Sequence, residues 1–128
     1  MSYYFSKAVD LSFDEAVARV TADLKKEGFG ILTEIDVKQT LKEKLNVDFR
    51  RYRILGACNP PFAYKALEAE DWIGLLMPCN VVVQERPDGT VEVAAVDPLA
   101  SMSAVDSPAL RDLAGEVREK LRSVVDSL

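Results

Sequence analysis

The stretch CNVVVQERPDGTVEVAAV, residues 79–96, decides how the rest of the sequence is read. Two β-prone runs, residues 79–86 and 90–96, flank a Pro-Asp-Gly turn at residues 87–89. Proline fixes φ and glycine supplies the positive φ that closes a tight turn. Successive side chains in each run alternate between two faces, as in a strand with one buried side. This stretch therefore predicts an antiparallel β-hairpin.

Amphipathic helices are predicted on both sides of this hairpin. Ser12 and Glu15 form a capping box ahead of apolar residues at helical spacing, and Gly28 suits a left-handed helix end. Ser107 and Pro108 open a second helix, whose apolar stripe continues to the end of the sequence. We expect this last stripe to pack on the protein's own sheet rather than on a partner.

Strands and helices alternate in the middle of the chain. Strands are predicted over residues 3–9, 29–36 and 52–58, and helices begin after Asp36 and Asn59, each in the position of an N-cap. The residues expected on one face of the second strand are Phe29, Ile31, Thr33 and Ile35.

The two remaining connections have weaker patterns. Residues 71–77 fit either a short helix or an extended piece, and residues 97–106 are predicted to form a loop. The resulting order is β-α-β-α-β-α-β-β-α. It predicts an α+β fold, with a mixed β-sheet of about five strands and helices packed on it, as a single domain over residues 1–128.

Composition excludes several classes of function. The chain has 128 residues, no histidine, and 16 Lys and Arg against 21 Asp and Glu, so 16 − 21 gives a net charge of −5. Without histidine there is no Ser-His or Cys-His nucleophile pair, and an acidic chain does not suit nucleic acid. Neither a signal peptide nor a membrane-spanning run is apparent. Two cysteines do not make a disulfide framework, so we expect a cytoplasmic protein with reduced thiols.

The two cysteines are the first candidates for chemistry. Cys58 ends a predicted strand just before a helix start, where free N–H groups and the helix dipole favour a thiolate. Cys79 begins the hairpin, and both cysteines are followed by asparagine. Adjacent strand ends would make them a dithiol or a soft-metal pair. The alternative is that both are small buried hydrophobes, and no CxxC spacing is present.

Three polar residues at strand ends are further candidates for a ligand site. Asp36 and Asp97 each follow a predicted strand, and Asn59 follows Cys58. Each also has a structural explanation, which we favour. Asp36 together with Gln39 caps a helix, Asp97 opens a turn before proline, and Asn59 is an N-cap.

Aromatic and basic residues give weaker signals. Phe62 and Trp72 are candidates to line a pocket, although buried aromatic side chains usually belong to the core. The cluster Arg-Arg-Tyr-Arg at residues 50–53 lies on a predicted strand, so alternation divides its charges between two faces. A continuous nucleic-acid surface is therefore not expected.

These pieces together resemble a known family. The segments that carry the resemblance are Ile35-Asp36, Cys58-Asn59-Pro60, Leu76 to Val83, Asp88-Gly89 and Asp97-Pro98, followed by the last amphipathic helix. Their order and spacing resemble the family known as domain of unknown function 302. The resemblance implies a small bacterial or archaeal α/β sandwich that tends to dimerise and has no established reaction. It also implies that the shared polar positions are Asp36, Cys58, Asn59, Cys79 and Asp97. The family often has a basic residue after the second cysteine, but here Asn80 follows, which argues against an anion site beside Cys79.

Two functions are compatible with these residues. The first is a homodimeric module that binds a small molecule or a protein, with no catalytic residue, no nucleic acid and no membrane. The second is a thiol-based redox or soft-metal protein that uses Cys58 and Cys79, with Asp36 or Asp97 orienting a substrate. We favour the first, because perturbed chemistry requires a built site. The ligand, and with it any cofactor or metal, stays open.

Overall fold

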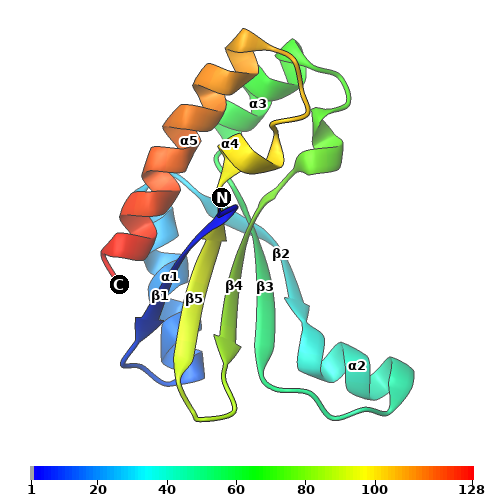
Figure 1. Cartoon of the computed structure of the whole chain (residues 1–128), viewed down its shortest axis with the longest axis vertical. Coiled ribbons are helices and arrows are strands. Elements are labelled where there is room, and N and C mark those ends of the chain that lie inside the picture. Colours follow the sequence, from blue (N-terminus) through cyan, green and yellow to red (C-terminus); the bar gives the residue numbers. More distant parts are fainter. Residues whose placement is uncertain (1) are drawn as a thin grey trace.

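A five-stranded antiparallel sheet forms the frame of the protein (Figure 1). The structure is a computed structural model and describes residues 2–128. The strands are β1 (Tyr4–Val9), β2 (Gly30–Asp36), β3 (Tyr52–Cys58), β4 (Cys79–Glu85) and β5 (Val91–Val96). Their spatial order is β1-β5-β4-β3-β2.

The α+β fold and the order of elements predicted from the sequence are confirmed. The sheet is antiparallel throughout, whereas a mixed sheet was expected. Parallel neighbours need a helix that crosses over the sheet. The helix α2 (Val37–Leu45) instead lies beyond the strand ends and reverses the chain, so β2 and β3 pair antiparallel (Figure 1).

Five further helices complete the chain. They are α1 (Phe13–Lys26), α3 (Pro60–Ala69), the 3-10 helix η1 (Ile73–Leu76), α4 (Pro98–Ser101) and α5 (Pro108–Asp126). The undecided segment 71–77 thus contains a short helix. The predicted loop 97–106 contains α4, which was not expected. Here the Asp97 side chain accepts a hydrogen bond from the Leu99 N–H at 3.0 Å, so the carboxylate caps a helical turn rather than a simple turn.

The local cap signals at the two long helices are confirmed. Ser12 and Glu15 form both hydrogen bonds of a capping box at the start of α1. Gly28 follows α1 with φ of 88°, and the Ser107 hydroxyl accepts from the Leu110 N–H at the start of α5. These bonds depend on neighbouring residues alone, which is why the sequence predicts them.

The main core lies between one face of the sheet and the helices α1 and α5. Both helices contact the sheet and each other, so the stripe of α5 packs on the protein's own sheet as predicted. The largest fully buried side chains of this core are Leu24, Phe29, Leu55, Val81, Val93 and Leu121.

The alternation predicted for residues 29–36 is interrupted. The pairing of β2 with β3 shifts between Ile31 and Thr33, so Ile31 lies opposite Ala57 while Thr33 lies opposite Gly56. This irregularity leaves Leu32 as an extra, exposed residue. Ile31 and Ile35 therefore lie on opposite faces of the sheet, and the expectation that they share one face is wrong.

The second face of the sheet carries an apolar row. Pairing places Ile35 opposite Ile54, Ile54 opposite Val82 and Val82 opposite Ala94, across four strands. The neighbours of these residues along each strand, such as Leu55, Val81 and Val83, are buried under the helices. The row itself is partly exposed, and Ile35 is exposed. Antiparallel sheets usually present polar residues on an open face, so this apolar row is unusual.

Candidate functional site

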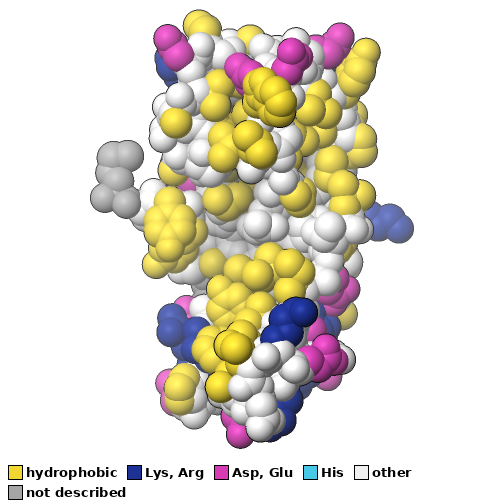
Figure 2. Space-filling model, turned by 90° about the vertical axis from the view of Figure 1, so that its right-hand side faces the viewer, with side chains coloured by type: hydrophobic (Ala, Val, Ile, Leu, Met, Phe, Trp, Pro, Cys, Tyr) yellow, Lys and Arg dark blue, Asp and Glu magenta, His cyan; other side chains and the backbone are white. Residues whose placement is uncertain are grey.

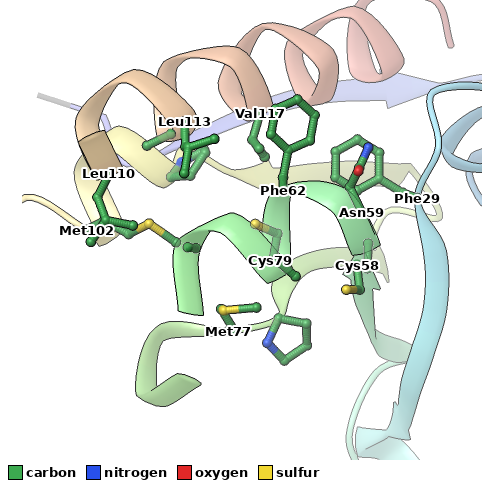
Figure 3. Close-up of a pocket in the computed structure, with 16 residues that line it drawn as sticks. Phe29, Cys58, Asn59, Phe62, Met77, Cys79, Met102, Leu110, Leu113 and Val117 are labelled. Atoms are coloured by element: carbon green, nitrogen blue, oxygen red, sulfur yellow. The ribbon is translucent and has the colours of Figure 1, made fainter. Parts of the chain in front are cut away.

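A cavity of about 50 Å³ lies where α3 packs between α5 and the ends of β3 and β4 (Figure 3). Its lining is nearly all apolar. Phe29, Phe62, Leu110 and Val117 contribute hydrocarbon, and Met77 and Met102 contribute thioethers. Phe29 and Leu110 are buried, while Phe62 and both methionines are half-buried. One wall of the cavity is therefore close to solvent.

The sheet brings the two cysteines to this cavity. Cys58 ends β3 and Cys79 begins β4, and Cys79 pairs with Ala57, so the two cysteines are diagonal neighbours on adjacent strands. Both line the cavity, and both are free thiols. The sequence placed each at a strand end, but the antiparallel order of β3 and β4 is what joins these ends.

Both thiols are protonated at neutral pH, and burial raises their pKa values further from that range. Burial raises the pKa of Cys58 above its usual value. The pKa of Cys79 rises to about 11, first because of burial and second because of the nearby Cys58. We expected the start of α3 to favour a Cys58 thiolate, but desolvation acts in the opposite direction and determines the shift. Reactive cysteines have lowered pKa values, so these thiols are poor nucleophiles.

Asn59 has a different role from the one predicted. It occupies the N-cap position of α3, but its side chain makes no cap hydrogen bond. Its Nδ2 donates instead to the backbone oxygen of Glu27, at 3.3 Å. A Cβ on Gly28 would lie 2.9 Å from the same Nδ2, so glycine there allows the approach. The buried amide thus fastens the start of α3 to the end of α1, and it lines the cavity.

Asp97 lies beside the cavity, but its carboxylate oxygens already accept hydrogen bonds from the protein itself. It is buried, caps α4, and accepts a hydrogen bond from Arg118 Nε at 3.1 Å. The neighbouring Pro98 lines the cavity. The carboxylate therefore positions one wall and presents no free charge to a ligand.

Asp36 lies at the opposite end of the sheet from the cysteines. Gly30 pairs with Cys58 at one end of β2, and Asp36 pairs with Arg53 at the other, about 20 Å away at roughly 3.3 Å per residue. Its side chain accepts a hydrogen bond from the Gln39 N–H at 3.0 Å and so caps α2. The Gln39 side chain bonds to Glu43 rather than completing a capping box. The structure therefore joins Cys58, Asn59 and Cys79 at the cavity, places Asp97 next to it, and leaves Asp36 apart.

Comparison with known proteins agrees with this architecture. The sequence profile "Domain of unknown function DUF302" matches residues 5–128. The chain belongs to this family. A DUF302 crystal structure, described as "uncharacterized conserved protein DUF302 from Bacillus stearothermophilus", has 29% sequence identity to it and a TM-score of 0.91. The match covers 98% of each chain. No match was found among the curated proteins.

Membership in DUF302 identifies a fold without a reaction, so the cavity itself must indicate the chemistry. Among residues 2–128, no group of three or more His, Cys, Asp or Glu side chains could hold a metal ion. No charged side chain lines the cavity in this part of the chain. In residues 2–128, likewise, no helix is both long and apolar enough to cross a membrane. The cavity therefore suits a neutral, apolar group.

Sequence reasoning missed most of the cavity wall. Phe62 lines the cavity as suggested, but Trp72 is exposed and does not. Met77 and Met102 belong to segments 71–77 and 97–106, whose sequence patterns predict only connections, and both line the cavity. Their position depends on how η1 and α4 fold back over α3 and α5, and no local pattern signals that packing.

Proposed function

We propose that this DUF302 protein is a homodimeric module that binds a small, neutral, apolar ligand and performs no acid–base catalysis. The observation that carries this proposal is the cavity at α3, which is lined by hydrocarbon and sulfur and lacks a charged lining group. Ligand sites are mostly apolar, with a few polar groups that fix orientation. The Asn59 amide and the two protonated thiols are the available polar groups.

The size of the cavity limits the ligand. An apolar cavity of about 150 Å³ takes up benzene or xenon, and this one is roughly a third of that volume. It fits a methyl or methylthio group as it stands. A longer apolar chain would need α3 to move outward, and Ala66 is the one residue within this helix that is buried.

The apolar row on the second face of the sheet supports the homodimer. Ile35 is exposed and the other three residues of the row are half-buried. Adjoining apolar side chains on an open sheet face suit an interaction site. Ile35, Ile54, Val82 and Ala94 would be covered by the same row of a second copy. The free thiols fit a reducing compartment, so we place the protein in the cytoplasm.

The alternative, a thiol-based redox or soft-metal protein, has weaker support. Its favourable observation is that Cys58 and Cys79 line one cavity. A thiolate is the nucleophile and the metal ligand, and burial raises the pKa of both thiols. Either use would therefore first require deprotonation against this burial.

Methyl NMR of methionine tests ligand binding directly. With ¹³C-methyl methionine, adding dimethyl sulfide should shift the signals of Met77 and Met102, which line the cavity. Ala63→Leu should abolish the shifts by filling the cavity. Ala69→Leu, on the exposed side of the same helix, should preserve them. Unchanged methionine signals at saturating probe would contradict the proposal. Light scattering tests the dimer, which should have about twice the 14.2 kDa mass of one chain.

A further inference from the structure

A basic arm projects from the lower end of the sheet. We define the arm as residues 37–50, which comprise α2 and the connection to β3 (Figure 1). The helix α2 has no buried residue, and Leu45 and Val47 are 66% and 43% exposed. The arm has four Lys and Arg and two Asp and Glu, so 4 − 2 gives a charge of +2. An exposed helix with apolar residues and positive charge is a docking element without a partner in one chain.

An acidic tip lies at the other end of the molecule. We define the tip as residues 64–76, from the middle of α3 to the end of η1. Its exposed large apolar residues are Tyr64, Leu67, Trp72, Leu75 and Leu76. The tip has one lysine and three carboxylates, Glu68, Glu70 and Asp71, so 1 − 3 gives a charge of −2.

The arm and the tip contain most of the exposed apolar residues of the protein. Of the eleven large apolar side chains exposed within residues 2–128, seven lie in these two segments. Both segments lie on one side of the molecule. Figure 2 shows this side, with hydrophobic and mainly acidic side chains above, hydrophobic side chains with both basic and acidic ones below, and a hydrophobic patch between the two ends. In Figure 1 the tip is at the upper right and the arm at the lower right.

Charge selects one of the two ways in which copies can meet on this side. A two-fold axis across the long direction places each arm against the partner's tip, so +2 meets −2 at two equivalent contacts. A two-fold axis along the long direction would place tip on tip and arm on arm, which brings like charges together. We propose that two copies pack antiparallel, with the arm of each copy docked on the tip of the other. This inference rests on the homodimer of the proposed function and specifies its interface.

The lysines of the arm can serve both their own chain and a partner. Lys38 Nζ donates to the Phe49 backbone oxygen at 2.8 Å, and Lys42 lies 3.3 Å from Asp48 Oδ1. These bonds hold the arm together. An ammonium group has three donors, and the Lys42 side chain is 55% exposed. Donors therefore remain for carboxylates of the partner's tip.

The proposed contact also connects the dimer to the ligand cavity. The tip includes the second half of α3, and Ala66 lines the cavity from this half. Met77, directly after η1, lines it too. An arm docked on the partner's tip would cover the outer side of this wall. Ligand entry and dimer formation should then influence each other.

Charge reversal and rescue test the arrangement. Lys42→Gln with Lys44→Glu makes the arm net acidic while keeping an amide donor for Asp48, and Glu68→Lys with Asp71→Lys makes the tip net basic. Glu70 is left intact because it accepts a hydrogen bond from the Trp72 N–H.

Sedimentation should show each double reversal weakening the dimer by about tenfold or more, because two contacts change from attraction to repulsion. The quadruple variant should return to within about threefold of wild type, since it restores opposite charges. The control Lys25→Glu with Arg111→Glu, on exposed positions of α1 and α5, should leave the dimer unchanged.

The single tryptophan gives a second readout. Trp72 is 75% exposed in one chain, so its fluorescence emission should shift to shorter wavelength as the dimer forms. The protein concentration at the midpoint of this shift should equal the dimer dissociation constant measured by sedimentation. A wild-type dimer that ignores both reversals, or a quadruple variant weaker than either double variant, would overturn the arm-to-tip contact and leave the homodimer intact. A wild-type chain that stays monomeric at high micromolar concentration would refute the homodimer itself.

Discussion

Replacing Asn59 by aspartate distinguishes two roles for this residue. As an N-cap, aspartate is as good as asparagine, and its charge would suit the start of α3. If the residue instead links α3 to α1, aspartate cannot replace asparagine, because it has no N–H to donate to the Glu27 backbone oxygen, 3.3 Å from Asn59 Nδ2. We expect the lost hydrogen bond to cost about 1 kcal/mol. A carboxylate that is 9% exposed and faces a helix C-terminus costs about 1–2 kcal/mol more. The favourable interaction of the new negative charge with the N-terminus of α3 offsets roughly 0.5 kcal/mol of this loss. Asn59→Asp should therefore destabilise the protein by about 2 kcal/mol.

Urea unfolding at pH 7 measures this difference, with Ser107→Asp as the matched control. Ser107 caps α5 with its side chain, so aspartate there should change the free energy of unfolding by less than about 0.5 kcal/mol. The reasoning is refuted if Asn59→Asp is as stable as wild type. An unchanged m-value would show that both variants unfold from the same native state.

Three further predictions follow from side-chain surroundings. The pKa of Cys79 in the folded protein, about 11, lies above its usual 9.0. The stability that this difference contributes is therefore complete below pH 9 and disappears as the pH rises to about 11. Urea unfolding across this pH range should show that the free energy of unfolding falls less in Cys79→Ser than in wild type. Asp97→Asn keeps a capping side chain but loses the ion pair with its arginine, which should cost about 1–2 kcal/mol in urea unfolding. Asp14→Asn removes the exposed ion pair of Asp14 with Arg51 and should lower the free energy of unfolding by less than about 0.5 kcal/mol. Equal losses of stability in Asp97→Asn and Asp14→Asn would contradict the difference between a buried and an exposed ion pair. Gly56→Ala would press a Cβ against Thr33 Oγ1 and should lower the thermal midpoint, at a cost of about 1–3 kcal/mol; an unchanged midpoint would show that β2 moves aside freely.

The parts of the fold that the sequence predicts are those held by local interactions. The caps at Ser12 and Ser107 and the turn at residues 87–89 depend on residues within three or four positions of each other. The hairpin and the two amphipathic helices follow from these signals and from periodicity. Their predicted bounds agree with the structure to within about two residues, which is the usual spread of helix and strand ends.

The parts that the sequence does not predict depend on contacts between distant segments. Leu32 interrupts β2 because of its pairing with β3, and no residue type near it marks the position. Asn59 satisfies the rule for an N-cap, yet its amide donates to Glu27, thirty-two residues earlier in the chain. The candidate site was predicted in part for the same reason. The strand ends of Cys58 and Cys79 were visible, but the packing of Met77 and Met102 beside them was not.

Crystallography under xenon pressure tests the central claim most directly. Xenon is neutral, polarisable and apolar, and it occupies dry hydrophobic cavities. The account predicts one xenon atom at high occupancy between Phe62, Met77 and Cys79, and no xenon there in Ala63→Leu. Well-ordered water in that space, with no xenon at any pressure tested, would contradict a site built for an apolar ligand.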